Sequence, residues 1–416
     1  MKKILLIIID GLGDEPIPQL ENKTPLEAAQ TPNLDFLAKN GILGQVLPYF
    51  EKGKLPTSED THLALFGYNP KAFNSGRGVL EVLGAGQEIL PGDVCLRGNF
   101  ATVDKKMKIL DRRAGRIENT EPLIEAISNI EVAENFSHLP PRAATRHSAI
   151  EGVKFLIKKA FSHRIGIVMR GQNLSPEISD GDPKITGVQP RQIKPKDKTK
   201  SAEFTAKVLN EFLGKAHLIL KNHPLNKERI KKGLLPANFL LVRGAGEMRK
   251  IPSFKERYNL RACCIAGGTL YKGIGKYFGM DLIEVEGANG LPNTNLKGKI
   301  LATKNALKTY DFVFLHIKAA DSLAEDGNFL GKKEFIERLD KNLKPLIRLK
   351  NVLICVTGDH STCSLMKSHC KLPNPVLIFD NGRDKIEKFS EKECQNGKLG
   401  RIKQIDLIKI IKKYAQ

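Results

Sequence analysis

The chain has 416 residues, of which 41% are hydrophobic and 27% charged, which is typical of a globular protein with two or three domains. Its formal net charge is +21, and the excess is spread along the chain: residues 91–236 carry +11 and the remainder carries +10. This distribution argues against a basic nucleic-acid-binding arm, so we expect no nucleic-acid partner. A basic cleft for a phosphorylated anion explains the charge at least as well.

Membrane insertion is also not expected. The apolar run at the start of the chain ends at Asp10 without a cleavage site. No apolar stretch approaches the ~20 residues that cross a bilayer. The seven cysteines show no C-x-x-C spacing, which predicts reduced thiols. We therefore expect a soluble, cytoplasmic protein.

The first residues predict a buried strand followed by candidate site residues. Residues 3–9 are rich in β-branched side chains and end at Asp10-Gly11, which places a carboxylate at the carboxyl end of the strand. Helices are predicted to begin after Thr24 and Thr31, each of which precedes a proline. Residues 55–67 predict a loop that opens a helix near Ser58. A hydroxyl at a helix amino end is well placed to become an alkoxide or to carry a phosphoryl group, although a plain N-cap is the commoner role.

The middle of the chain is richer in predicted strands and in arginine than the two ends. Strands are predicted at 93–103 and 163–171, and a Pro- and Lys-rich linker at 189–200. Arginines lie at strand ends and in glycine-containing turns, where a guanidinium can capture phosphate or carboxylate through two hydrogen bonds. A solvated basic face is an equally good explanation for any one of them.

Alternation of strands and helices resumes after residue 236 and predicts the fold class. Strands are predicted at 237–242, 262–266, 281–285, 311–317 and 351–356. We expect an α/β core with a mostly parallel sheet flanked by helices, built from residues 1–88 and 237–416. A smaller α+β insert domain, residues 89–236, interrupts this core.

Candidate ligands gather at the predicted strand ends, where open α/β sheets bind their ligands. They are three carboxylates, two imidazoles and a hydroxyl: Asp10, Asp321, Asp359, His360, His369 and Ser58. Mixed nitrogen and oxygen donors suit a two-metal site, which can clamp the attacking and leaving oxygens of a phosphoryl transfer. For an isolated Asp-His pair, a helix cap beside a surface histidine is the plainer interpretation.

Several motifs occur together, in order and at suitable spacing. They are Asp10-Gly11, residues 23–29, Ser58 with residues 62–68, and the segments 99–104, 111–117, 240–246, 264–267 and 357–362. Through them the chain resembles the archaeal-type, cofactor-independent phosphoglycerate mutases of the alkaline phosphatase superfamily. The resemblance implies an alkaline-phosphatase-like core and interconversion of 3-phosphoglycerate and 2-phosphoglycerate through a phosphoserine. It also implies a small phosphorylated acid as substrate, two divalent metal ions, and no 2,3-bisphosphoglycerate cofactor.

The resemblance assigns roles to individual residues. Ser58 is the implied nucleophile, one metal is held by Asp10, Ser58, Asp359 and His360, and the other by Asp321 and His369. The family pattern has a histidine ligand four residues beyond the aspartate, where this chain has Glu325. If residues 321–325 are helical, both carboxylates lie on one face and reach one cation, which favours Mn²⁺ or Mg²⁺ over Zn²⁺. A solvated surface glutamate is the alternative.

Substrate binding is expected mainly in the insert. The implied anion-binding residues are Arg97, Arg113, Arg116 and Arg170, with Arg243 and Lys272 contributing from the core. Closure of the insert would exclude water, which would otherwise turn a mutase into a phosphatase.

Two other functions are compatible with the same motifs. One is a metal-dependent phosphatase or phosphotransferase that acts on another small phosphorylated or hydroxylated acid, because related enzymes share the metal-binding core. The other is a binding protein that has lost catalysis, against which the presence of Ser58 argues. The sequence predicts neither the oligomeric state nor which divalent metal is used.

Overall fold

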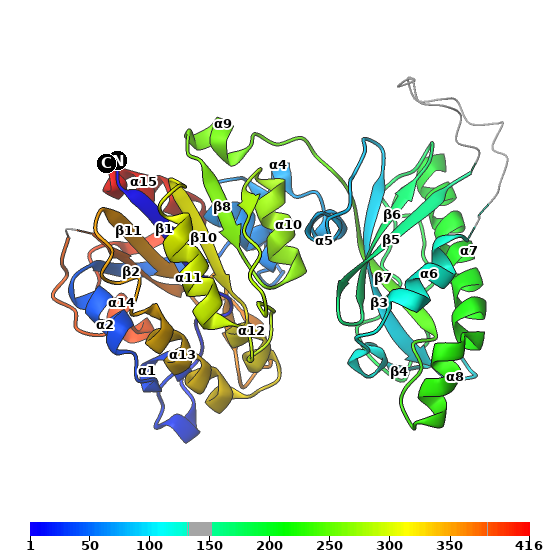
Figure 1. Ribbon diagram of the computed structural model, residues 1–416, viewed down its shortest axis with the longest axis horizontal. Helices are drawn as coiled ribbons and strands as arrows, with labels where there is room; N and C mark the ends of the chain where they lie inside the picture. Colours follow the sequence, from blue (N-terminus) through cyan, green and yellow to red (C-terminus); the bar gives the residue numbers. More distant parts are fainter. Residues whose placement is uncertain (131, 133–151, 381) are drawn as a thin grey trace. The chain divides into compact units, whose positions relative to one another are not determined.

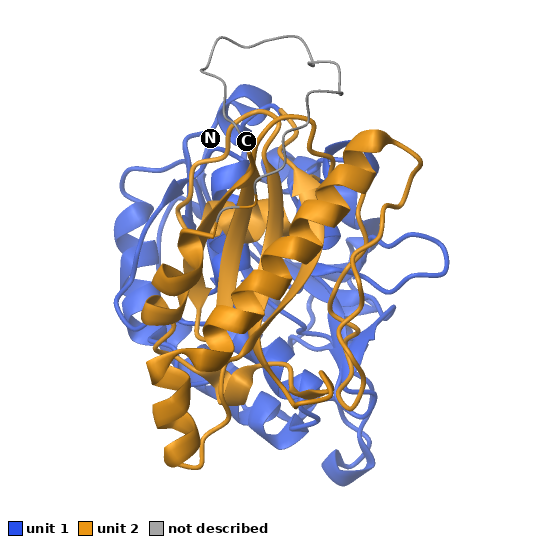
Figure 2. Cartoon of the chain, turned by 90° about the vertical axis from the view of Figure 1, so that its right-hand side faces the viewer, with its two compact units in different colours: residues 1–74, 251–416 blue, residues 75–250 orange. Residues whose placement is uncertain are grey.

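The structure is a computed structural model that describes residues 1–130, 132, 152–380 and 382–416. The chain divides into two units (Figure 2): unit 1 comprises residues 1–74 and 251–416, and unit 2 comprises residues 75–250. The predicted boundaries, after residue 88 and before residue 237, differ from this division at both ends. The reason is that helix α5 (Arg77–Gly84) and strand β7 (Phe239–Glu247) pack against or pair with strand β3 (Val94–Val103) of unit 2.

Unit 1 contains an eight-stranded sheet in the order β15-β2-β14-β11-β1-β10-β8-β9 (Figure 1). The central strand β1 is buried from Ile4 onward and runs parallel to β10 and β11, whereas β14 is antiparallel to both of its neighbours. The expected mostly parallel α/β sheet is therefore confirmed. The strands are β1 (Lys3–Ile9), β2 (Ile42–Leu47), β8 (Ala262–Ile265), β9 (Asp281–Leu282), β10 (Phe312–Ile317), β11 (Val352–Thr357), β14 (Asn374–Phe379) and β15 (Gly400–Lys403).

Helices cover both faces of this sheet, because each strand presents apolar side chains to both sides. Leu5, Ile7 and Ile9 pack into the core beneath α2 (Pro32–Lys39), α11 (Leu296–Ala306) and α13 (Phe329–Leu343). The opposite face carries α10 (Thr269–Tyr277) and α15 (Leu407–Ala415). The predicted helix starts are confirmed: α1 (Pro25–Ala28) begins with a capping box between Thr24 and Glu27, and α2 follows Thr31.

A separate two-stranded sheet belongs to the same unit. Strands β12 (Ser361–Cys363) and β13 (Ser368–Cys370) are antiparallel, and their register places Thr362 opposite His369. Cys363 and Cys370 form a disulfide across the pair, so the prediction that the cysteines are reduced thiols is wrong for these two. The sequence spacing of Cys363 and Cys370 does not indicate a disulfide, because the two sulfur atoms come together only when β12 and β13 pair. His369 therefore lies on this small sheet and not at the end of a parallel strand.

Unit 2 is the α+β part of the chain. Its antiparallel sheet has the order β4-β3-β6-β5, and β7 pairs with β3. One face packs against α6 (Glu121–Ser128) and α7 (Lys200–Asn222), and the other packs against α5. The remaining bounds are β4 (Ile109–Asp111), β5 (Lys154–Phe161), β6 (Arg164–Arg170) and α8 (Pro224–Lys231).

Within the described ranges, no helix is long and apolar enough to cross a membrane.

Candidate active site

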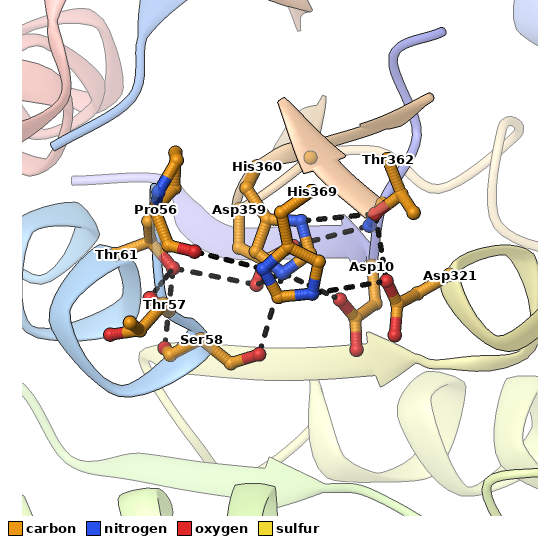
Figure 3. A network of polar contacts seen from close by, with 12 residues as sticks. Asp10, Pro56, Thr57, Ser58, Thr61, Asp321, Asp359, His360, Thr362 and His369 are labelled. Carbon is orange, nitrogen blue, oxygen red and sulfur yellow. Dashed lines mark hydrogen bonds and ion pairs between the residues drawn. The ribbon is translucent and has the colours of Figure 1, made fainter. Parts of the chain in front are cut away.

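Three buried carboxylates meet near the carboxyl ends of the central strands of unit 1. Asp10 follows β1, Asp359 follows β11, and Asp321 lies on α12 (Ala319–Glu325) just after β10. Because β1 pairs in parallel with both β10 and β11, Asp10 comes together with the other two carboxylates although it is more than 300 residues from either in sequence. The strand-end prediction for these carboxylates therefore agrees with the geometry (Figure 3).

His360 links this cluster to the candidate nucleophile. Its Nε2 lies 3.5 Å from Asp10 Oδ1, 3.3 Å from Asp359 Oδ2 and 3.4 Å from Ser58 Oγ. Ser58 is the first residue of α3 (Ser58–Leu65), and the N-cap is Thr57, whose side chain accepts from the Asp60 amide. The cap role that Ser58 could have filled thus belongs to Thr57, and the Ser58 hydroxyl points to His360 instead (Figure 3).

His369 forms a second cluster with Asp321 and His360. Its Nδ1 lies 2.8 Å from the carbonyl oxygen of Pro56, a contact in which Nδ1–H donates and leaves the Nε2 lone pair free. That Nε2 lies 3.6 Å from Asp321 Oδ1 and 3.9 Å from Glu325 Oε1. Asp321 and Glu325 are one helical turn apart on α12, as predicted, and Glu325 is 51% exposed. Glu325 therefore borders the cluster from its solvent side.

Sequence reasoning missed several residues that hold these groups in place. His62, one helical turn after Ser58, contacts the Ser58 carbonyl oxygen through Nδ1 at 2.7 Å and Asp359 Oδ2 at 3.5 Å. The i, i+4 spacing of Ser58 and His62 was a signal that could have identified it. The others contact the carboxylates directly: Thr61 donates to Asp359, Thr362 to Asp321, Tyr271 to Asp10, and Lys318 to both Asp10 and Asp321.

The electrostatics of the cluster favour a bound cation. Burial, reinforced by the charge of Asp359, raises the pKa of Asp10 to about 7. Burial and the charge of Asp321 raise the pKa of Asp359 to about 6. Burial alone would also raise the pKa of Asp321, but Lys318 and His360 hold it below its ordinary value. These carboxylates repel one another, and positive charge placed among them would relieve that repulsion.

The donor atoms fit two divalent metal ions. Those of Asp10, Asp359 and His360 lie within 4.8 Å of one another, as do those of Asp321, His360 and His369. Asp10 Oδ1 has no hydrogen-bond partner among the described residues. Burial lowers the pKa of His360 to about 3, so its imidazole is neutral and able to ligate. Mixed carboxylate and imidazole donors suit first-row divalent ions.

A third group of acids and sulfur nearby does not fit a metal. The donor atoms of Asp14, Glu15 and Cys363 also lie within 4.8 Å of one another. Cys363 is held in the disulfide, and the Asp14 carboxylate accepts from buried Lys332 and from Ser364. Two of the three groups, Asp14 and Cys363, are therefore already engaged in other contacts.

The predicted anion-binding side chains fall into distinct environments. Arg97 is only 4% exposed and lies 3.4 Å from Glu81, and Arg243 is its direct neighbour across β3 and β7. Arg113 and Arg116 are exposed. Arg170 makes a two-pronged ion pair with Asp93, and Lys272 pairs with Glu284 on unit 1. Arg97 and Arg243 are therefore neighbours, whereas Arg170 and Lys272 are each paired with an acidic side chain.

The chain matches a known protein family over almost its whole length. Residues 2–413 match the family described as the Metalloenzyme superfamily, so the chain belongs to that superfamily.

Within it, the chain belongs to the 2,3-bisphosphoglycerate-independent phosphoglycerate mutase family. It is 47% identical to mutase 1 of Archaeoglobus fulgidus and 43% identical to mutase 1 of Methanocaldococcus jannaschii, in each case over 98% of this chain and 96% of the relative. The solved cofactor-independent phosphoglycerate mutase of Thermoplasma acidophilum is 35% identical over the full length of both chains, with a TM-score of 0.65. A protein of Pyrococcus horikoshii superposes with a TM-score of 0.80 at 33% identity, over 100% of this chain and 97% of that one.

Proposed function

We propose that this protein is a cofactor-independent phosphoglycerate mutase that interconverts 3-phosphoglycerate and 2-phosphoglycerate through a phosphoserine at Ser58. The observation that carries the proposal is the position of Ser58 Oγ, 3.4 Å from Nε2 of the histidine that both metal-type clusters share. The names of the relatives support the same activity. No 2,3-bisphosphoglycerate is needed, because the phosphoryl group is held by the protein between its two positions.

The proposed ligand sets follow the two clusters. Asp10, Ser58, Asp359 and His360 hold one divalent ion, and Asp321, Glu325 and His369 hold the other. The oxygen-rich second set favours Mn²⁺ or Mg²⁺. When bound, the two ions lower the pKa of the serine hydroxyl and neutralise the charge of the transferring phosphoryl group.

The protein's own residues then set up the transfer. Ser58 Oγ loses its proton and forms a bond to phosphorus while the bond from phosphorus to the substrate oxygen breaks. That oxygen takes up a proton to give glycerate, so the proton lost by the serine is balanced. The reverse step returns the phosphoryl group to the other hydroxyl of the same glycerate. Ser58 sits at the first residue of α3, where the helix dipole stabilises negative charge on the phosphoserine. His62 holds the Ser58 backbone in place through the contact of its Nδ1 with the Ser58 carbonyl oxygen.

Recognition of the substrate anion is assigned to unit 2. Arg97 and Arg243 are the preferred residues, because they are neighbours across the sheet and the Nε of each has no hydrogen-bond partner among the described residues. Arg113 and Arg116 are retained as exposed, weaker contributors. Arg170 and Lys272 are not used in this proposal, since Asp93 and Glu284 already bind them.

The direct test is turnover of 3-phosphoglycerate with enolase as the coupling enzyme, in Mn²⁺ or Mg²⁺ and in chelator. We expect metal-dependent product formation in the wild type and none in Ser58→Ala. Intact-mass measurement after exposure to substrate should show one added phosphoryl group only when Ser58 is present. Ser253→Ala is the matched control, because Ser253 is a true N-cap of α9 (Phe254–Tyr258) in the same unit.

The outcomes separate the proposed mutase from its alternatives. Release of inorganic phosphate without 2-phosphoglycerate would identify a phosphatase. Substantial mutase turnover by Ser58→Ala would exclude the phosphoserine mechanism. An N-cap loss costs only about 1 kcal/mol, so Ser253→Ala should remain folded and active.

A further inference from the structure

A threonine hydroxyl lies between the two candidate ligand clusters. Thr362 on β12 is fully buried, and its Oγ1 lies 2.7 Å from Asp321 Oδ1 and 3.3 Å from His360 Nδ1 (Figure 3). In the proposed ligand sets, Asp321 holds one ion and His360 holds the other. One hydroxyl therefore contacts a ligand of each ion.

The chemistry of the three groups gives both hydrogen bonds a direction. A carboxylate accepts, so the single Oγ1–H proton of Thr362 goes to Asp321, the closer and charged partner. The same oxygen must then accept from His360, whose Nδ1 carries the ring proton. This arrangement leaves the lone pair on Nε2, the nitrogen that faces Asp10 and Ser58. Thr362 thus selects the tautomer of His360 that can bind a metal ion through Nε2.

The backbone of Thr362 is held on both sides. Its amide donates to the Gly13 carbonyl oxygen at 3.0 Å, and its carbonyl oxygen accepts from Lys332 Nζ at 3.1 Å. Lys332 is fully buried on α13 and also donates to the Gly13 carbonyl oxygen at 3.2 Å and to the Asp14 carboxylate at 2.9 Å. The three protons of this ammonium group therefore have three acceptors. These contacts fix Thr362 between the loop after β1 and α13.

A glycine leaves the space that the hydroxyl occupies. Gly11 has a φ of +65°, which favours glycine, and a Cβ there would lie 2.6 Å from Thr362 Oγ1 and 2.8 Å from the Asp321 Cα. A side chain at position 11 would therefore displace the Thr362 hydroxyl from Asp321. The loop after β1 is built to let this hydroxyl approach both ligands.

We propose that Thr362 is a positioning residue of the two-ion site, whose one hydroxyl sets the tautomer of His360 and the orientation of Asp321 and so supports both metal ions. It acts through these two ligands and is not itself a ligand. The inference deepens the proposed function and rests on it for the presence of two ions. It does not depend on the identity of the substrate, so metal binding can test it without turnover.

The first test removes the hydroxyl and measures the binding of both ions. Thr362→Val keeps the branched shape of the side chain, whereas Thr362→Ser keeps the hydroxyl. In a calorimetric titration with Mn²⁺, both dissociation constants should rise about 10–100-fold in Thr362→Val, the usual effect of losing a group that orients metal ligands. Thr362→Ser should bind both ions as the wild type does. The matched control is Thr303→Val, because Thr303 is equally buried in unit 1 and donates to the Lys299 carbonyl oxygen within α11.

The second test needs no metal. NMR of protein labelled with ¹⁵N-histidine, in chelator at neutral pH, reports which ring nitrogen of His360 carries the proton. The His360 signals are identified by their loss in His360→Gln. We expect the proton on Nδ1 in the wild type and a mixture of the two tautomers in Thr362→Val. A residue that served packing alone would not change this ratio.

The proposal is overturned if the metal-free wild type carries the His360 proton on Nε2. It is also overturned if Thr362→Val weakens one ion or neither, or if Thr362→Ser or Thr303→Val binds Mn²⁺ as weakly as Thr362→Val. If Thr362→Val does not fold, the wild-type tautomer and the affinities of Thr362→Ser decide.

Failure of this inference can be told apart from failure of the proposed function. Two bound ions without mutase turnover would contradict the proposed function alone. Mutase turnover with unchanged metal affinities in Thr362→Val would contradict this inference alone. A wild type that binds no Mn²⁺ would overturn both.

Discussion

The rings of His360 and His369 are stacked, with centroids 3.8 Å apart and planes inclined by 26°. His360 follows a strand of the large sheet, whereas His369 lies on the small β12–β13 sheet and pairs with Thr362. Nε2 of His360 faces Ser58 and Asp10, while Nε2 of His369 faces Asp321 and Glu325. The stacking therefore brings the two candidate ligand clusters side by side.

Glu325 should behave as a metal ligand. Glu325→Gln is expected to weaken one of two bound metals and to lower activity strongly, because a neutral amide is a poorer ligand than a carboxylate. Glu325→His should retain activity and shift the metal preference towards softer ions. Metal content by elemental analysis, alongside the coupled assay, gives the answer. Asp326→Asn is the control, since Asp326 is the exposed acid next to it; a Gln variant with two metals and full rate would make Glu325 a bystander.

His62 should support Ser58 without being a ligand. His62→Ala removes the contacts to the Ser58 carbonyl oxygen and to Asp359, so we expect kcat or metal affinity to fall by about 10–100-fold. The effect on KM should be small, because the side chain is fully buried behind the site. Steady-state kinetics and a metal titration are the measurements. An unchanged kcat and an unchanged metal affinity together would remove His62 from the mechanism.

Stability without metal should depend on pH through Asp10. The pKa of this carboxyl rises from 3.8 to about 7 on folding, so the folded protein keeps a proton that the unfolded chain loses. The contribution of Asp10 to stability therefore falls as pH rises through this window, by an amount on the order of a few kcal/mol. In chelator, Asp10→Asn should gain stability relative to the wild type between pH 4 and about 7. A constant difference between the two proteins across this range would contradict the burial argument.

The same carboxyl predicts the opposite trend for metal binding. A metal ion competes with the proton on Asp10, so the wild type should bind divalent ions more tightly as pH rises through about 7. Asp10→Asn should bind weakly at every pH. Isothermal titration with Mn²⁺ at several pH values measures both trends.

The disulfide should stabilise the second metal position. The Cys363–Cys370 link closes the strand pair that carries His369, with a sequence separation of seven residues. Replacing both cysteines with serine is expected to cost about 2–3 kcal/mol by loop-closure entropy and to weaken one metal preferentially. A dithiol reductant should move the wild type towards the double variant and leave that variant unchanged. If metal affinity stays the same in the double variant, the link serves stability alone.

The anion site should distinguish buried from exposed arginines. Arg97→Lys keeps the charge and loses the planar fork, so kcat/KM should fall by about 10–100-fold, which corresponds to 1.5–3 kcal/mol for a charged hydrogen bond. Arg113→Lys and Arg116→Lys should lower kcat/KM less, because both side chains are exposed to solvent. Arg170→Lys is the matched control within the same sheet, since Asp93 holds its fork. Unchanged kinetics in Arg97→Lys would move the anion site elsewhere.

The parts of the site that follow apolar runs could be predicted from the sequence. Asp10 and Asp359 can be located because each lies within two residues of the end of a buried strand, and these two strands pair in parallel. His369 is among the candidate ligands that the sequence predicts, but its place on a separate small sheet could not be predicted, because it depends on the register of β12 and β13. Lys318 and Tyr271 reach Asp10 from different elements, and no local pattern encodes that meeting.

The arginine environments could not be predicted for a similar reason. Arg97 and Arg170 look alike in sequence, yet Asp93 binds one and Glu81 contacts the other. Glu81 carried no signal of its own, because its burial depends on how closely α5 packs on the sheet of unit 2. The predicted boundaries of the insert differ from those of unit 2 at the same helix and at β7, whose pairing with β3 is long-range.

The pairing of β1 with strands that come much later in the chain has a consequence for folding during synthesis. This strand, apolar and buried from Ile4 onward, is synthesised long before its two partners β10 and β11, which lie some 300 residues later in the chain. At about 5–20 residues per second, β1 waits roughly 15–60 s for them, while all of unit 2 has already emerged. Such distant pairing slows folding and leaves both edges of an aggregation-prone strand open. Until residue 357 has been made, both edges of β1 therefore lack their native partner strands.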